Sequence, residues 1–189
     1  MAAQVGKGLD LDGANDYIVG LPTGTAIRSA DNFTISMWAN HDSESSADYN
    51  EFFSNWVSTG SKGSMFLRYQ SSSNQLVFAI ADGSYENCAN TVAIEGALHH
   101  IAVVFDSGDA TVYLDGSALA NTITGLESRA GYTGGQAFWW GASPHFSGEN
   151  VPGIVDELQI ALASRASGWI TAEYDQTDDN ATFWGTWSW

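Results

Sequence analysis

The stretch Asn32-Phe-Thr-Ile-Ser-Met-Trp-Ala-Asn40 decides the fold class, because its apolar and polar residues alternate. In an extended chain successive side chains point to opposite sides, so a period of two gives a β-strand two distinct faces. One face carries Phe33, Ile35, Met37 and Ala39, and the other carries Thr34, Ser36, Trp38 and Asn40. The apolar face is suited to a hydrophobic core, so we expect this segment in a sheet that packs on that side.

Short apolar runs of the same kind recur along the chain, separated by Gly, Asn, Asp and Ser. Strands are expected over 9–12, 17–19, 51–57, 64–69, 75–81, 99–106, 110–114, 136–141 and 153–160. With this register, the side chains of Leu9, Leu11, Phe33, Ile35, Met37, Val112 and Leu114 are expected to be buried. Helical spacing occurs over 167–174, where Ser167 can cap the first turn. Many short strands and one short helix near the C-terminus predict an all-β fold, a two-sheet antiparallel jelly-roll sandwich.

The charge balance restricts the classes of partner. The chain has 189 residues, of which 6 are Lys or Arg and 22 are Asp or Glu, and its formal net charge is −16. Proteins that bind nucleic-acid backbones need clustered basic residues, and so do proteins that dock on anionic membranes. The composition therefore argues against both. Six basic residues cannot neutralise 22 acidic ones, so we expect solvent, salt or bound cations such as calcium to balance the remaining charge.

A single domain over residues 1–189 is expected, because the length suits one core and no linker or repeat interrupts it. Cys88 is the only cysteine, which excludes an internal disulfide. No apolar run reaches about 18 residues, and the first residues lack the basic and apolar parts of a signal peptide. We therefore interpret the chain as a module of a longer exported protein, located outside the cell or at its surface, without direct insertion into a membrane.

Several motifs occur in a characteristic order. The first two are Gly8-Leu-Asp-Leu-Asp-Gly-Ala-Asn-Asp-Tyr-Ile18 and Asn32-Phe-Thr-Ile-Ser-Met-Trp38; the later ones cover 98–105, 112–116, 153–160 and 169–174. Together they resemble the opening strand, second signature, central hairpin, closing strand and short helix of laminin G-like jelly rolls in the concanavalin A-like lectin/glucanase superfamily. Leu98 departs from the pattern, since an aromatic residue is usual at that position.

The resemblance implies two stacked antiparallel sheets of about six or seven strands each, with the opening and closing strands side by side. For bacterial modules of this kind it also implies sugar or glycan binding, adhesion or substrate targeting. A fold does not fix a function, so the implied function is an expectation.

Oxygen-bearing side chains around the first turn predict a calcium site. Asp12, Asn15 and Asp16 stand close together in the Asp-Gly-Ala-Asn-Asp turn, and calcium takes about six to eight oxygen ligands. The resemblance places the closing strand beside the opening strand, so Asp156 would complete the site. The alternative is that Asp12 and Asn15 stabilise the turn through hydrogen bonds from side chain to backbone.

Aromatic side chains on polar strand faces are the candidates for sugar binding, because a ring stacks on a sugar while neighbouring polar groups bind its hydroxyls. Trp38 with Asn40 is the first choice, and Trp56 and Arg68 come next. Tyr85, Tyr132, His145 and Phe146 would add rings from loops. The alternative is that most of these rings fill the core between the sheets. Neutral sugars are expected first, because a charge of −16 repels polyanions.

An enzyme of this fold is not favoured, because the chain lacks the Glu-x-Asp-x-x-Glu motif that glucanases of the fold carry on one strand. Asp156 and Glu157 are adjacent, so on a strand their side chains diverge. We therefore predict a non-catalytic, calcium-stabilised carbohydrate-binding module of an exported adhesin or polysaccharide-targeting protein, with a cell-surface protein as a further partner. A protein-interaction module, marked by an exposed apolar patch, stays an alternative. So does a glycan hydrolase or lyase, marked by two carboxyls close together in a cleft.

Overall fold

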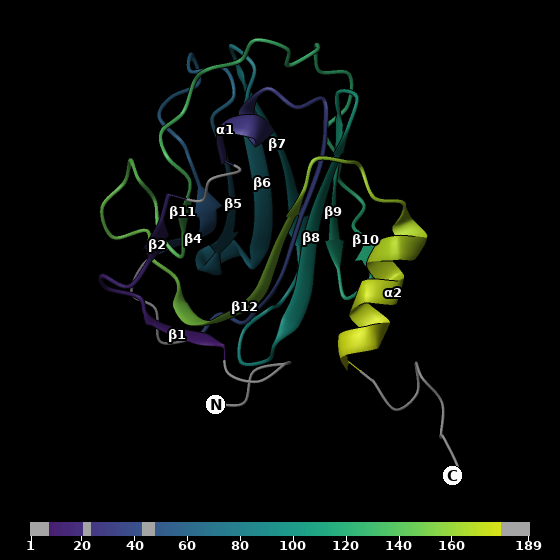
Figure 1. Cartoon of the computed structure of the whole chain (residues 1–189). Coiled ribbons are helices and arrows are strands. Elements are labelled where there is room, and N and C mark those ends of the chain that lie inside the picture. Colours follow the sequence, from purple (N-terminus) through teal and green to yellow (C-terminus); the bar gives the residue numbers. More distant parts are fainter. Residues whose placement is uncertain (1–7, 21–23, 43–47, 179–189) are drawn as a thin grey trace.

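The computed structural model describes residues 8–20, 24–42 and 48–178. Within these residues the chain forms two antiparallel sheets of six strands each (Figure 1). The first sheet has the order β1 (Leu9–Asp12), β12 (Pro152–Ala161), β3 (Asn32–Ala39), β8 (His99–Asp106), β9 (Asp109–Leu114) and β10 (Ser117–Ala118). The second has the order β2 (Ile18–Val19), β11 (Trp139–Trp140), β4 (Tyr49–Ser54), β5 (Met65–Gln70), β6 (Gln75–Ala81) and β7 (Tyr85–Thr91). The predicted jelly-roll sandwich is confirmed.

The main core lies between the sheets and is built from every second residue of the central strands. Phe33 of β3 stacks on Phe105 of β8, with ring centroids 5.2 Å apart. Of the residues predicted to be inside, Leu11, Phe33, Ile35, Met37 and Val112 are buried. Leu114 is half-buried, and Leu9 is 43% exposed because β1 is an edge strand with one neighbour. The register predicted for the central strands is therefore right.

Strand β12 closes the first sheet. It pairs with β1 on one side and with β3 on the other, so the opening and closing strands do lie side by side. Along β3, Asp156 pairs with Trp38 and Gln159 pairs with Ser36, which leaves one extra residue in β12. Glu157 adopts a φ of 51° within this β-bulge. The bulge changes which side chains of β12 point outward after Asp156.

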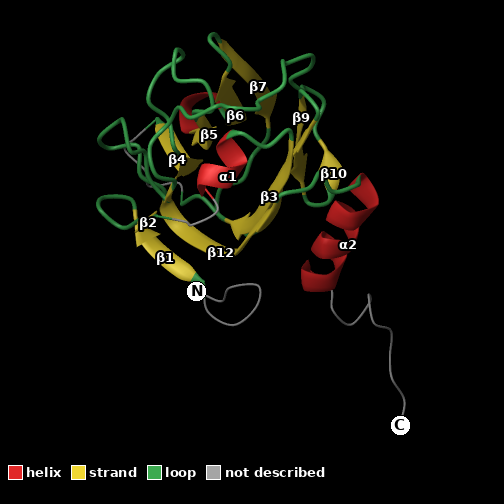
Figure 2. Cartoon of the chain, turned by 45° about the horizontal axis from the view of Figure 1, so that its top comes forward, coloured by secondary structure: helices red, strands yellow, loops and turns green. Residues whose placement is uncertain are grey.

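Helix α2 (Ser167–Asp178) covers the outer face of the first sheet, as Figure 2 shows. Ile170 is completely buried in a small apolar cluster with Ala102, Val104 and Tyr113. The predicted helix over 167–174 is confirmed and continues to Asp178. None of the helices in the described ranges is long and apolar enough to cross a membrane.

Some elements have no counterpart in the sequence prediction: β7, β10, the short helix α1 (Gly24–Arg28) and the 3-10 turn η1 (Ser71–Ser73). The sequence of β7, Tyr-Glu-Asn-Cys-Ala-Asn-Thr, is mostly polar and lacks apolar alternation. It forms a strand because all seven of its residues pair with β6. The strand expected over 136–141 is reduced to the two residues of β11.

A glycine contact at the start of β12 gives a test of this arrangement. Gly153 has a φ of +135°, and a Cβ there would lie 2.6 Å from the Asn40 carbonyl oxygen. We expect Gly153→Ala to lower the free energy of unfolding by about 2–4 kcal/mol, through backbone strain and overpacking. Gly168→Ala is the matched control, because a Cβ there meets nothing within 4 Å and alanine favours a helix. Urea unfolding measures both; equal effects would contradict the close β3–β12 contact.

Candidate functional site

Trp38 and Asn40 do not form the exposed platform predicted for them. Trp38 is 2% exposed, and its ring lies 5.8 Å from Tyr174 of α2 and 5.5 Å from His100. Asn40 is 3% exposed, and its side-chain oxygen accepts a hydrogen bond from the Ile154 backbone N–H. This part of the prediction is wrong, because α2 covers the polar face of β3 and Asn40 fastens β3 to β12.

Trp56 and Arg68 lie together on the outer face of the second sheet. Trp56 is 6% exposed and contacts Phe66 edge to face, with centroids 5.1 Å apart. The Arg68 guanidinium lies over the rings of Tyr49 and Phe66, at 4.1 and 4.6 Å from their centroids. Trp56 therefore supports this surface from below, while Arg68 is held over it by two cation–π contacts.

Rings with exposed area mark both ends of the same face. One row of paired residues crosses the six strands: Val19, Trp139, Ser54, Phe66, Ala79 and Asn87. At the β2 end, Tyr17 is 46% exposed and stacks on Trp139 at 4.4 Å. At the β7 end, Tyr85 is 40% exposed and lies edge-on to Trp56. We call this surface the aromatic face; it comprises Tyr17, Tyr49, Trp56, Phe66, Arg68, Tyr85 and Trp139.

Sequence reasoning missed Tyr17, Tyr49 and Trp139 and expected Tyr85 in a loop. Trp139 belongs to a strand of two residues, β11, and Tyr17 directly precedes another strand of two residues, β2. Strands this short show no alternation in the sequence. One signal was present: in the pair Trp139-Trp140 one ring must point out if the other points in. Trp140 indeed belongs to the core, and Trp139 lies on the aromatic face.

Two carboxyl groups are buried beside Arg68. Glu51 pairs with Arg68 across β4 and β5, and its side chain is completely buried. Its backbone N–H donates to the Glu149 carbonyl at 3.2 Å. Burial raises the pKa of Glu51 to about 8, against the lowering effect of the Ser54 hydroxyl, and the neighbouring Glu149 carboxylate raises it further. Burial raises the pKa of Glu149 as well. The Glu51 carboxyl therefore keeps its proton to a higher pH than an exposed glutamate does.

The Glu51–Glu149 pair does not have the layout of a glycosidase acid and base. Both catalytic carboxyls of such an enzyme must reach the glycosidic bond from either side. Glu51 is completely buried, so a sugar chain cannot reach its carboxyl in this structure. The pair contributes to the electrostatics beneath the aromatic face rather than to an open cleft.

The four predicted calcium ligands do not converge. The Asp12 carboxylate accepts backbone N–H groups of Ala14 at 2.8 Å and Asn15 at 3.1 Å, and these bonds lower its pKa. The Asp16 carboxylate accepts the Asp12 N–H at 3.1 Å. Asp12 pairs with Pro152. Asp156 lies four residues further along β12, so about 13 Å of strand separates it from the partner of Asp12. The prediction that Asp156 completes a calcium site with Asp12, Asn15 and Asp16 is therefore wrong.

The turn hydrogen bonds agree with the alternative interpretation of Asp12. In the described part of the chain, no group of three His, Cys, Asp or Glu side chains is placed to hold one metal ion. Whether the Asp12–Asp16 turn binds calcium stays a prediction.

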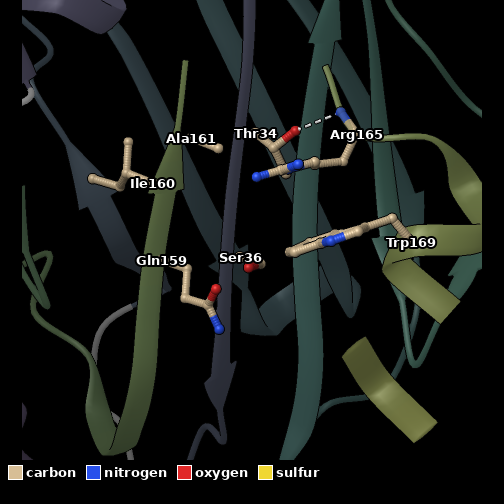
Figure 3. A pocket seen from close by; sticks show the side chains of 7 residues that line it. All are labelled: Thr34, Ser36, Gln159, Ile160, Ala161, Arg165 and Trp169. Carbon is tan, nitrogen blue, oxygen red and sulfur yellow. Dashed lines mark hydrogen bonds between the residues drawn. The ribbon is translucent and has the colours of Figure 1, made fainter. Parts of the chain in front are cut away.

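A concave feature lies on the outer face of the first sheet. Between β3, β12 and α2 there is a small pocket with a volume of about 110 Å³ (Figure 3). Its lining includes Thr34, Ser36, Gln159, Ala161, Arg165 and Trp169. None of the predicted site residues reaches it.

The buried carboxyl of Glu51 gives a pH-dependent prediction. Its pKa is raised from 4.5 to about 8, so the folded state binds a proton that the unfolded chain releases. The contribution of Glu51 to stability should therefore fall as the pH rises from 4.5 to about 8 and change no further above that pH. We expect Glu51→Gln to remove roughly 2–5 kcal/mol of this pH dependence, measured by urea unfolding between about pH 4 and pH 9. Glu157→Gln, at an exposed acid, is the control; identical pH profiles for all three proteins would contradict the burial of Glu51.

Comparison with known proteins agrees with the fold. Residues 12–170 match the family model Laminin_G_3, described as concanavalin A-like lectin/glucanases superfamily. No curated protein sequence matches the chain.

Solved structures with low sequence identity share the sandwich. The chain is similar to the Ruminococcus gnavus IT-sialidase CBM40, with a TM-score of 0.68 and 13% identity over 88% of this chain and 96% of that one. It is similar to domain 4 of AbnA, a GH43 extracellular arabinanase from Geobacillus stearothermophilus, solved in complex with arabinotriose (TM-score 0.69, 18% identity, 89% and 77% covered). It is also similar to the binding domain of Paraclostridial Mosquitocidal Protein 1 (TM-score 0.73, 13% identity, 94% and 45% covered). With the two six-stranded sheets and the family match over residues 12–170, the chain belongs to the concanavalin A-like lectin/glucanases superfamily.

Proposed function

We propose that the chain is a non-catalytic carbohydrate-binding module and that the aromatic face holds the sugar. The observation that carries this proposal is the exposure of Tyr17 and Tyr85 at opposite ends of one sheet face, with Arg68 between them. The C–H faces of a sugar ring pack on aromatic rings, and nearby polar groups bind its hydroxyls. Because Tyr17 stacks on Trp139 and Tyr85 contacts Trp56, both rings are pre-oriented.

The names of structural neighbours support a sugar as the ligand. One structure of the Ruminococcus gnavus IT-sialidase CBM40 is bound to alpha2,6 sialyllactose, and the arabinanase domain is in complex with arabinotriose. The first of these ligands is acidic and the second is neutral. For this chain we propose neutral sugars first, because a net charge of −16 opposes the approach of an acidic polymer.

The proposal extends to the setting of the module. We propose that it belongs to an exported adhesin or polysaccharide-targeting protein and works outside the cell or at its surface, where it holds a neighbouring domain on a glycan or on a cell-surface protein. The similarity to a domain of an extracellular arabinanase supports this setting. So does the excess of 22 acidic over 6 basic residues, which a saline medium screens.

Truncation of one ring at each end of the aromatic face tests the binding site. A glycan array selects the best neutral ligand, with arabinotriose as the first probe, and calorimetry then measures its affinity. We expect Tyr85→Ala and Trp139→Ala each to weaken binding about thirtyfold, which corresponds to the loss of about 2 kcal/mol at a hot spot. Leu162→Ala is the control, because Leu162 is 55% exposed and follows β12 in the other sheet.

Two results would contradict the proposal. Unchanged affinity in both ring variants would show that the sugar does not bind to this face. Absence of binding to any neutral glycan at about millimolar concentration would favour the protein-interaction alternative.

Calcium at the first turn is a separate proposal, supported by the oxygen-bearing side chains of Asp12, Asn15 and Asp16 within five residues. An ion that binds the folded state alone stabilises it by about 2.7 kcal/mol at 100-fold excess over Kd. We therefore expect a chelator to lower the melting midpoint by roughly 5–10 °C. Asp12→Asn should remove this sensitivity, whereas Asp156→Asn should keep it because Asp156 lies elsewhere on β12. A melting curve that excess chelator leaves unchanged would exclude a structural ion.

A further inference from the structure

The pocket beside α2 exists because of the bulge in β12. With one extra residue after Asp156, Gln159 pairs with Ser36 and Ala161 pairs with Thr34. Ser36 and Thr34 point to the outer face of the sheet, so the bulge directs the Gln159 amide and the small Ala161 side chain to the same face, while Leu158 packs against the core. Helix α2 begins at Ser167, and its Trp169 together with the preceding Arg165 borders this part of the face. The result is a recess with an amide on one side and a small methyl group at its base.

Arg165 and Trp169 form the opposite side of the recess. The Arg165 guanidinium lies 4.8 Å from the centroid of the Trp169 ring, and in Figure 3 both side chains reach from the α2 side towards β12. The Arg165 backbone N–H donates to the Thr34 hydroxyl at 3.0 Å, which fixes the start of this side chain. The cation–π contact therefore orders a guanidinium that stays exposed to solvent.

No carboxylate within the described residues forms an ion pair with Arg165. This is notable in a chain with 22 acidic and 6 basic residues, where an acidic partner for an arginine is easily found. A planar guanidinium presents five N–H donors in a fork that matches a carboxylate. Glu173 of α2, which contacts the pocket residue Ser36, is engaged by other groups: it accepts the Ser36 hydroxyl at 3.0 Å and lies 3.4 Å from the His100 ring nitrogen.

We propose that this pocket is a second ligand site, which binds one acidic monosaccharide with its carboxylate on Arg165. The Gln159 amide both donates and accepts, as ring hydroxyls require. The side chains of Trp169 and Ala161 offer apolar contact to the ring carbons. The volume of about 110 Å³ is smaller than the cavity of about 150 Å³ that encloses benzene, so the pocket takes the carboxylate end of one sugar ring and leaves the rest of the ring in solvent.

The orientation follows from the charges around the pocket. Arg165 is the cation at one end, and Glu173 lies beyond Ser36 at the other. The carboxylate is therefore directed towards Arg165 and away from Glu173. The hydroxyls of Thr34 and Ser36 already donate to Ala163 and Glu173, so specificity depends on Arg165 and Gln159. The site lies on the opposite sheet from the aromatic face, and its test does not depend on the proposed function.

Titration of the full 189-residue chain with D-glucuronate, followed by nitrogen-proton NMR, tests the site. D-glucose carries the same ring without the carboxylate, and acetate carries the carboxylate without the ring. We expect glucuronate to saturate with a Kd of about 1 mM, which is ordinary for a ligand of this size. Glucose and acetate should each bind at least about tenfold more weakly.

Arg165→Gln should weaken glucuronate binding at least about tenfold through the loss of charge-assisted hydrogen bonds. Lys62→Gln is the matched control, because it removes the same charge from an exposed side chain elsewhere. Equal affinity in these two variants would overturn the proposal. So would equal binding of acetate and glucuronate, which marks a simple anion contact, or a titration that does not saturate. Gln159→Ala, at an exposed position, should lower the preference for glucuronate over acetate.

Discussion

Strand β12 is hydrogen-bonded to β1 along one edge and to β3 along the other, and most of the arrangement follows from this double pairing. Its first half needs a glycine at position 153, because the backbone of Asn40 approaches too closely for a side chain. Its second half is shifted by one residue through the bulge, which turns Gln159 outward. Strand β12 therefore both closes the first sheet and determines what that sheet presents to solvent.

The two outer faces of the sandwich differ because only one of them is covered. On the first sheet, Ile170 of α2 packs against Ala102 and Val104, and Tyr174 of α2 stacks on Trp38, so α2 covers the Trp38 ring. On the second sheet, Tyr17 beside Trp139 and Tyr85 beside Trp56 stay about half exposed. The exposed rings are thus concentrated on the face that α2 leaves open.

Local patterns predicted the strands and the inward direction of Phe33, Ile35 and Met37, because a period of two depends on neighbours in the chain. The same pattern correctly predicted that Trp38 points to the outer face of the sheet. The burial of Trp38, however, depends on α2, which follows more than a hundred residues later. The error in the predicted calcium ligands has a similar cause. The adjacency of β1 and β12 was expected, but the sequence does not show the register of their pairing, which separates Asp12 from Asp156. The pairing of Glu51 with Glu149 also joins distant segments that carry no shared motif.

The adjacency of the first and last strands has a consequence for how the chain folds during synthesis. Residue 12 pairs with residue 152, so β1 cannot find its partner until almost the whole module has emerged. At about 5–20 residues per second, the ribosome needs on the order of 10 s to make the intervening segment. Throughout that time one edge of β3 has no strand beside it, and long-range pairing of this kind is slow. The module therefore completes its fold late, as a unit, after the last strand has been released.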